Sequence, residues 1–183
     1  YESVSNPLVS PDGGKIVYQK HWIDKTNDKR KTDLWTYSLK DLSNQNLVND
    51  ASLVGWSPNG KKLAFTKQAE NGGTQIFVRD MSGEGQITQV TRVHRTPDNI
   101  EWSPDGKHFA FTMLVPEGST EWNINIPFKP ANSEWTPSPR VIDDYKWRTD
   151  HQGIDEEGNR QIFIVEATGG TPIQVTDGKW NDN

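Results

Sequence analysis

The sequence contains no cysteine among its 183 residues and only two methionines. Without thiols the chain forms neither disulfide bonds nor thiolate metal sites, so its stability comes from packing and hydrogen bonding. The absence leaves the redox compartment open, because exported chains without cysteine also exist. With 32% hydrophobic and 25% charged residues, the chain is long enough to bury a substantial core.

Long apolar runs and large basic patches are also missing. No stretch approaches the roughly 18 apolar residues that a membrane helix needs. The net charge is −5, and lysines and arginines are scattered among acidic residues. The one basic cluster, KTNDKRK at 25–31, is short and interrupted, and we interpret it as a loop tip. We therefore expect neither a nucleic acid nor a membrane as partner.

The usual signatures of catalytic and metal sites are absent as well. A nucleophile elbow requires Gly-x-Ser-x-Gly, and no such string occurs. The run from Asp24 to Asp28 lacks the glycine and the glutamate of a calcium-binding loop. The histidines also lack the spacing of metal ligands: they are His21, His94, His108 and His151. We predict no catalytic residue, no metal site and no cofactor for this chain.

Three near-copies of one ten-residue pattern are the main positive signal. They are VSPDGGKIVY at 9–18, WSPNGKKLAF at 56–65 and WSPDGKHFAF at 102–111, separated by 47 and 46 residues. Proline presets φ for a type I turn, and glycine adopts the left-handed conformation that follows, so each copy predicts a β-hairpin. Each turn serine is expected to bond nearby backbone. The repeated turn residues are Ser10, Pro11, Asp12, Gly13, Ser57, Pro58, Asn59, Gly60, Ser103, Pro104, Asp105 and Gly106.

Two further strands follow each hairpin. In the second repeat they are QIFVRDM at 75–81 and QITQVT at 86–91, and in the first DLWTYSL at 33–39 and QNLVN at 45–49. The pattern predicts four-stranded antiparallel units that are apolar on both faces. Units of this kind, repeated every 46 or 47 residues, stack around an axis in a β-propeller. A β-sandwich is the alternative, but it leaves the repeat unexplained.

The third unit is interrupted. QIFIVEATGGTPIQVT at 161–176 matches the third and fourth strands of the second unit. The turn serine precedes the third-strand isoleucine by 19 residues from Ser57 to Ile76, but by 59 residues from Ser103 to Ile162. This difference predicts an insertion of about 40 residues, at about 113–160, between strands two and three of the third unit.

We therefore predict an all-β fold, a single partial β-propeller domain over 1–183 with three four-stranded antiparallel blades. Blade one covers about 1–50, blade two about 51–96 and blade three about 97–178, and 179–183 begin a next blade. Propellers usually close with four to eight blades, so either sequence outside this chain completes the ring or the blades form an open arc. Because the chain begins at Tyr1 and ends abruptly, we expect it to be part of a longer protein.

The hairpins, each followed by an apolar-small-aromatic strand, resemble the repeats of TolB-type propellers and of the N-terminal propellers of prolyl oligopeptidase family serine peptidases. The third unit resembles that of acylaminoacyl-peptidase-like members, with YKWR at 145–148, an Asp-x-x-Gly turn at 150–153 and an Ile-Phe strand ending in Gly-Gly-Thr-Pro. This resemblance implies a non-catalytic propeller that gates and scaffolds access of short peptides to an α/β-hydrolase domain carrying a Ser-His-Asp triad. Nothing in the sequence matches that domain. A TolB-like protein-binding module without enzyme activity is the alternative.

The resemblance also indicates candidate substrate contacts, namely Glu156, Glu157 and Arg148. Dipeptidyl peptidases of the same family hold a substrate amino terminus with paired glutamates on a propeller insertion. Here the pair lies between Gly153 and Gly158 without the aromatic context of that motif, and an exposed turn is the simpler interpretation. Members of both families are often bacterial and exported, so the resemblance favours a periplasmic location and leaves a cytoplasmic one open.

Uncovered blade faces predict self-association. In an open arc, the outer faces of blades one and three have no neighbour, and we expect apolar residues such as Ile16, Tyr18, Phe109 and Phe111 to contribute to the exposed surface. Exposed apolar patches of this size associate. The isolated chain is therefore expected to stack through its terminal blades. The tryptophans of the insertion are candidates for a surface shared with a partner domain: Trp122, Trp135 and Trp147.

Overall fold

The computed structural model describes residues 2–70, 72–116, 131–133, 148–149, 153–154 and 158–182. Regular structure in these ranges consists of fourteen strands, with no helix. Three of the sheets have four strands each, and hydrogen-bonded neighbours are consecutive strands of the chain except in the third sheet, where β10 pairs with β13. The predicted all-β fold of four-stranded antiparallel units is therefore confirmed. In the described ranges no helix has the length and hydropathy needed to cross a membrane.

Each four-stranded sheet is an antiparallel meander. Sheet one contains β1 (Glu2–Val9), β2 (Lys15–Asp24), β3 (Lys29–Ser38) and β4 (Ser43–Val48). Sheet two contains β5 (Ala51–Trp56), β6 (Lys62–Gln68), β7 (Thr74–Asp80) and β8 (Ile87–Gln89). Sheet three contains β9 (Asp98–Trp102), β10 (His108–Pro116), β13 (Gly158–Glu166) and β14 (Ile173–Gln174). A separate two-stranded sheet pairs β11 (Arg148–Thr149) with β12 (Gly153–Ile154).

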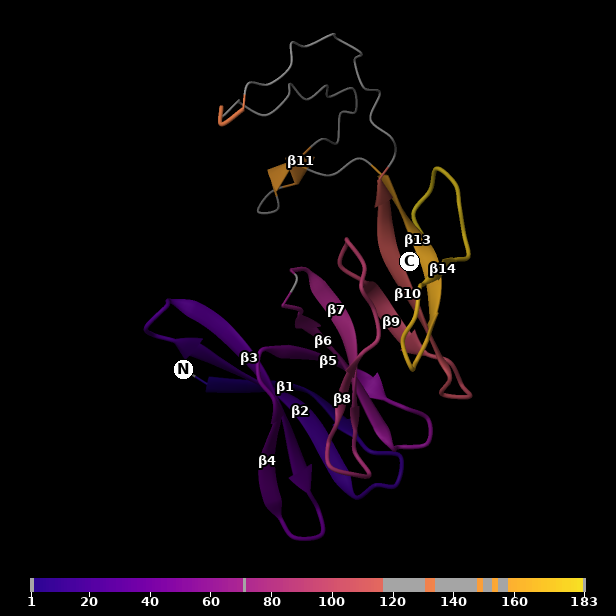
Figure 1. Cartoon of the computed structure of the whole chain (residues 1–183). Coiled ribbons are helices and arrows are strands. Elements are labelled where there is room, and N and C mark those ends of the chain that lie inside the picture. Colours follow the sequence, from indigo (N-terminus) through magenta and orange to yellow (C-terminus); the bar gives the residue numbers. More distant parts are fainter. Residues whose placement is uncertain are drawn as a thin grey trace.

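The three sheets succeed one another in chain order, with sheet two in the middle (Figure 1). Two hydrophobic clusters hold them together, one between sheets one and two and the other between sheets two and three. Alternate residues of sheet two supply both clusters, because successive side chains of a strand point to opposite faces. Leu63 and Phe65 lie in the first cluster, and Ala64 lies in the second. Sheet two is thus buried on both faces, as the apolar strands predict.

The repeat places the same aromatic pair in two sheets. Phe65 pairs with Phe77 across β6 and β7, and Phe111 pairs with Phe163 across β10 and β13. In both pairs the ring centroids are 5.7 Å apart and the rings are stacked. Cross-strand aromatic pairs of this kind stabilise a sheet by up to about 1 kcal/mol each.

The fourth strands of sheets two and three are shorter than the sequence predicts, and threonine hydroxyls explain this. QITQVT at 86–91 was expected to be a strand, but β8 ends at Gln89. The Thr91 hydroxyl accepts a hydrogen bond from the Ile76 amide at 2.9 Å, and the Thr176 hydroxyl does the same for Ile162 at 2.9 Å. Side-chain hydroxyls that take a backbone amide in this way compete with regular ladder bonds.

One expectation about the outer surfaces is wrong. Phe109 and Phe111 were expected to contribute exposed surface, but they are 0% and 1% exposed because they point into the cluster between sheets two and three. The exposed apolar residues of sheet three alternate with them across the sheet and are aliphatic: Ile164, Ile173 and Val175. On sheet one, Ile16 and Tyr18 are half-buried.

The strands that flank the predicted insertion pair along their whole length. The β10–β13 register runs from His108 opposite Glu166 to Pro116 opposite Gly158. Residues 113–116 and 158–160, which the sequence analysis assigned to the insertion, are therefore paired strand residues. Most of the chain between them lies outside the described residues.

Candidate functional site

The three Ser-Pro-Asp/Asn-Gly turns have one geometry. In the first, the Ser10 hydroxyl donates to Asp12 Oδ1 at 2.5 Å and accepts from the Lys15 amide at 2.9 Å. Gly13 has φ of 73°, and its amide donates to the Ser10 carbonyl at 2.8 Å. The turns at Ser57 and Ser103 repeat these bonds, with glycine φ values of 69° and 70°. These serines are thus engaged in holding backbone.

The same hydrogen bonds lower the pKa of the two turn aspartates. The pKa of Asp12 is lowered, chiefly by the hydrogen bond from the Ser10 hydroxyl and then by that from the Gly14 amide. The pKa of Asp105 is lowered by the Ser103 hydroxyl and by the Lys107 amide. Asn59 fills the same position in the second turn and makes the same contacts without a charge.

One tryptophan joins sheet two to sheet one, and another joins sheet three to sheet two. Trp56 Nε1 donates to the carbonyl oxygen of Leu8 at 3.4 Å, and Trp102 Nε1 donates to the carbonyl oxygen of Gly55 at 3.3 Å. Both indoles also pack against the hydrophobic cluster at their own interface. These hydrogen bonds were not predicted from the sequence, although both tryptophans immediately precede a Ser-Pro turn.

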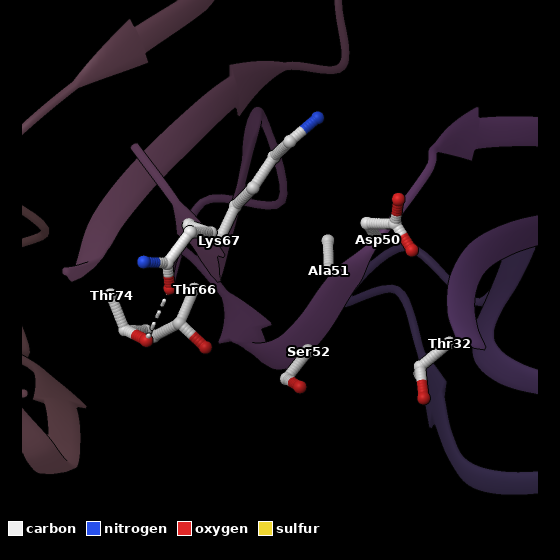
Figure 2. A pocket seen from close by; sticks show the side chains of 8 residues that line it. Thr32, Asp50, Ala51, Ser52, Thr66, Lys67 and Thr74 are labelled. Atoms are coloured by element: carbon white, nitrogen blue, oxygen red, sulfur yellow. Dashed lines mark hydrogen bonds between the residues drawn. The ribbon is translucent and has the colours of Figure 1, made fainter. Parts of the chain in front are cut away.

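A polar cleft of about 230 Å³ lies between sheets one and two (Figure 2). It opens at the end of these sheets where the second strand turns into the third. Thr74 Oγ1 donates to Gln68 Oε1 at 3.4 Å within the cleft, and Lys31 Nζ contacts Asp50 Oδ2 at 2.7 Å beside it. The residues lining the cleft are Thr32, Asp50, Ala51, Ser52, Thr66, Lys67, Gln68 and Thr74.

The chemistry of this cleft is hydrogen bonding. Hydroxyls, one carboxylate, one carboxamide and one ammonium group line it, and its volume is below the roughly 300 Å³ at which small-molecule sites begin. A second cleft of about 340 Å³ lies between β3 and β4 of sheet one and the turn after β7 of sheet two, near Lys15, Asp41 and Glu84. There Arg79 Nη1 donates to the Leu47 carbonyl at 3.2 Å, which ties sheet two to sheet one.

A serine–histidine contact in sheet one was not anticipated. Ser5 Oγ lies 2.7 Å from His21 Nε2, and His21 Nδ1 lies 2.9 Å from Thr32 Oγ1. A hydrolytic triad requires a carboxylate on the second ring nitrogen, and Thr32 supplies a hydroxyl instead. The histidine links β1, β2 and β3 across the sheet, so the contact stabilises sheet one.

The candidate substrate contacts are not brought together by the described residues. Glu156 and Glu157 lie outside the described ranges, as do Trp122, Trp135 and Trp147. Arg148 is in β11, opposite Ile154 of β12. Within the described part of the chain, no group of three histidine, aspartate or glutamate residues has the arrangement of a metal site.

Comparison with known proteins identifies the architecture. No protein-family model matches the chain. The chain is similar to the uncharacterized peptidase YuxL of Bacillus subtilis (strain 168), with 26% identity over 94 residues, which are 50% of this chain and 14% of that protein. The structure of an acylaminoacyl peptidase from Pyrococcus horikoshii matches with a TM-score of 0.71 at 17% identity, over 96% of this chain and 25% of that one.

A second structure is matched over a larger share of its own length. The β-propeller domain of the trilobed protease from Pyrococcus furiosus, described as having an open velcro topology, matches with a TM-score of 0.52 at 18% identity. The match covers 97% of this chain and 57% of that domain. The chain therefore spans about a quarter of the acylaminoacyl peptidase and about half of the isolated propeller. These likenesses show the fold: the three sheets are consecutive propeller blades, called blades one, two and three below.

Proposed function

We propose that the chain is a non-catalytic propeller section of a prolyl oligopeptidase family serine peptidase. In this proposal it gates and scaffolds access of short peptides to an α/β-hydrolase domain outside the sequence. The observation that carries the proposal is the match of 96% of the chain to an acylaminoacyl peptidase, at a TM-score of 0.71. The sequence similarity to YuxL, also described as a peptidase, supports it independently.

In the proposal the described side chains have a structural role and not a catalytic one. Each turn serine hydroxyl donates to the Asp or Asn side chain two residues on and accepts from a backbone amide, and the Ser5–His21 pair ends on Thr32 without a carboxylate. The tryptophan and arginine hydrogen bonds fix each blade to the one before it. In the proposal these bonds keep neighbouring blades in place, because size selection needs a passage of constant width.

Substrate contacts are proposed at one end of the blades. The polar cleft lies where the second strands of blades one and two turn into the third strands, and residues 117–157 leave blade three at the corresponding turn, between Pro116 and Gly158. In the proposal these residues form the insertion of blade three. Glu156 and Glu157 hold the substrate amino terminus, and Arg148 contacts the peptide.

Hydrolysis assays test the peptidase part of the proposal. Turnover of N-acylated aminoacyl p-nitroanilides is measured with the 183-residue chain and with the product of the whole reading frame that contains it. We expect turnover by the longer product and none by the 183-residue chain. If the longer product has no Gly-x-Ser-x-Gly elbow and no activity, the proposal is wrong and the TolB-like protein-binding module is favoured.

Gating and amino-terminus binding are tested with the longer product. We expect kcat/KM to fall as peptides lengthen, and cleavage of an unfolded protein as fast as a tetrapeptide contradicts gating. The double variant Glu156→Gln, Glu157→Gln is expected to raise KM about tenfold for peptides with a free amino terminus. Acylated peptides of the same sequence are the matched control, because they lack the charge that the glutamates bind.

A further inference from the structure

The second cleft lies at the opposite end of the strands from the polar cleft. Lys15 and Ser38 line it and pair with each other where β2 begins, whereas Thr32 of the polar cleft pairs with His21 near the end of β2. The volume of the second cleft, about 340 Å³, is above the roughly 300 Å³ at which small-molecule sites begin. This cleft is therefore a separate hollow with room for a small ligand.

A buried hydroxyl without a partner lines the second cleft. Thr36 is 7% exposed, and its Oγ1 atom makes no hydrogen bond within the described part of the chain. Gln45 lies opposite Thr36 on β4 and lines the same cleft. Its carboxamide forms no hydrogen bond to another described residue. Because buried polar groups are normally paired, these two side chains are available to hydrogen-bond a ligand.

Charged groups of both signs also line the second cleft. The cations are Lys15 and Arg79, and the carboxylates are Asp41, Asp80 and Glu84. Three of the five are engaged close by: Arg79 donates to the Leu47 carbonyl, Asp41 accepts from Ser38 and Ser43, and Asp80 accepts from Ser82 and the Gly83 amide.

The other two charges face the cleft from different blades. Lys15 belongs to blade one and Glu84 to the turn after β7 of blade two, and neither forms an ion pair with another described residue. The cleft therefore offers one ammonium group and one carboxylate, with the Thr36 hydroxyl and the Gln45 carboxamide as neutral hydrogen-bonding groups.

This set of groups decides between classes of ligand. The described residues contain no group of three acids arranged for a metal ion. An anion alone would meet three carboxylates, and an organic cation alone would meet two cations. A neutral polyol would use the hydroxyl and the carboxamide but would pair with neither Lys15 nor Glu84. A molecule that carries both an ammonium group and a carboxylate complements all four groups.

We propose that the second cleft binds a small zwitterion, an α-amino acid or a dipeptide. Its carboxylate pairs with Lys15, its ammonium group pairs with Glu84, and it hydrogen-bonds the Thr36 hydroxyl. The inference goes beyond the proposed function and does not depend on a hydrolase domain. Binding is measured on the 183-residue chain, so absence of peptidase activity from the longer product leaves it unaffected.

Titration of the 183-residue chain with alanine and with Ala-Ala, followed by nuclear magnetic resonance, tests the proposal. We expect a Kd of about 1 mM for at least one of the two. N-acetyl-Ala-Ala and Ala-Ala amide each lack one charge and should bind about threefold more weakly than Ala-Ala. The proposal is overturned if neither zwitterion binds at about 20 mM. It is also overturned if the two blocked peptides, or the neutral polyol erythritol, bind as tightly as the zwitterions.

Variants at the two charges assign the ends of the ligand. Glu84→Gln should remove the difference in affinity between Ala-Ala and its acetylated form, because the ammonium group then has no carboxylate to pair with. Lys15→Gln should remove the difference between Ala-Ala and its amide for the corresponding reason. If both differences persist in both variants, the ligand binds elsewhere and the proposal is wrong.

Thr36→Val separates a binding role from a structural one. We expect it to weaken Ala-Ala binding about fivefold and to leave the denaturation midpoint unchanged, because the hydroxyl has no internal partner to lose. Thr112→Val is the matched control: Thr112 is 4% exposed and donates to the Asp98 carbonyl at 3.3 Å, so this change should lower the midpoint and leave binding unchanged. Unchanged binding by Thr36→Val, or a midpoint loss equal to that of Thr112→Val, overturns the proposal.

Discussion

At the scale of single residues, the turn acids explain why one repeat unit tolerates two different side chains. Asp12 and Asp105 carry a charge, whereas Asn59 does not, yet all three accept a hydrogen bond from the turn serine. The geometry requires an acceptor two residues after the serine, and either side chain supplies one. The charge adds a dependence on pH that Asn59 lacks.

Acid is therefore expected to weaken the first and third turns. The pKa values of Asp12 and Asp105 are lowered in the folded chain, so their contribution to stability is complete above about pH 4 and is lost as pH falls through the lowered values. The double variant Asp12→Asn, Asp105→Asn should flatten the dependence of unfolding free energy on pH in that acid range. Urea denaturation from pH 2 to pH 6 measures this, and Asn59→Asp, which should steepen the dependence, is the matched control.

The turn glycines give a second prediction, because two of them differ in their surroundings. Gly13 and Gly60 both have positive φ, but a Cβ at Gly60 meets Pro11 Cδ of the preceding turn at 3.2 Å, while one at Gly13 meets nothing within 4 Å. We expect Gly13→Ala to cost about 1 kcal/mol, from the left-handed backbone alone, and Gly60→Ala to cost about 2 kcal/mol. Denaturation midpoints measure both. Equal losses would show that the contact with Pro11 is unimportant.

At the scale of strands and sheets, the tryptophan hydrogen bond is the feature that joins neighbouring blades. We expect Trp102→Phe to lower the unfolding free energy by about 1 kcal/mol, because the Gly55 carbonyl loses its donor. Trp102→Ala should cost about 3 kcal/mol, since packing against Phe109 is lost as well. Trp180→Phe is the control, because Trp180 is 60% exposed. If Trp102→Phe is as stable as the parent chain, the hydrogen bond contributes nothing.

The strands and hairpins were predictable wherever the repeated sequence pattern is clear. The continuous apolar residues at 63–65 predict a strand buried on both faces, and the Ser-Pro-Asp/Asn-Gly turns predict hairpins, because both signals are local. The short fourth strands were missed because Thr91 and Thr176 replace ladder bonds with side-chain ones. Which face of blade three is buried was also missed, since Phe109 and Ala110 are both apolar and only stacking order decides between them.

The candidate site was less predictable than the fold for a physical reason. Ser5, His21 and Thr32 are far apart in sequence and meet only because β1 and β3 both pair with β2. The polar cleft likewise combines residues from two sheets. Contacts that depend on strand register and on sheet stacking leave no short motif for a sequence reader to find.

At the scale of the whole molecule, the two internal interfaces share a direction. At each interface one blade offers an apolar face and a backbone carbonyl, and the other offers a tryptophan. Because the two surfaces differ, neighbouring blades are related by a repeated rotation and not by a twofold axis. Contacts of this heterologous type between identical molecules close into rings or grow into open fibres. Val9 stands where blades two and three have tryptophan, so the outer face of blade one lacks the indole that both internal joints use.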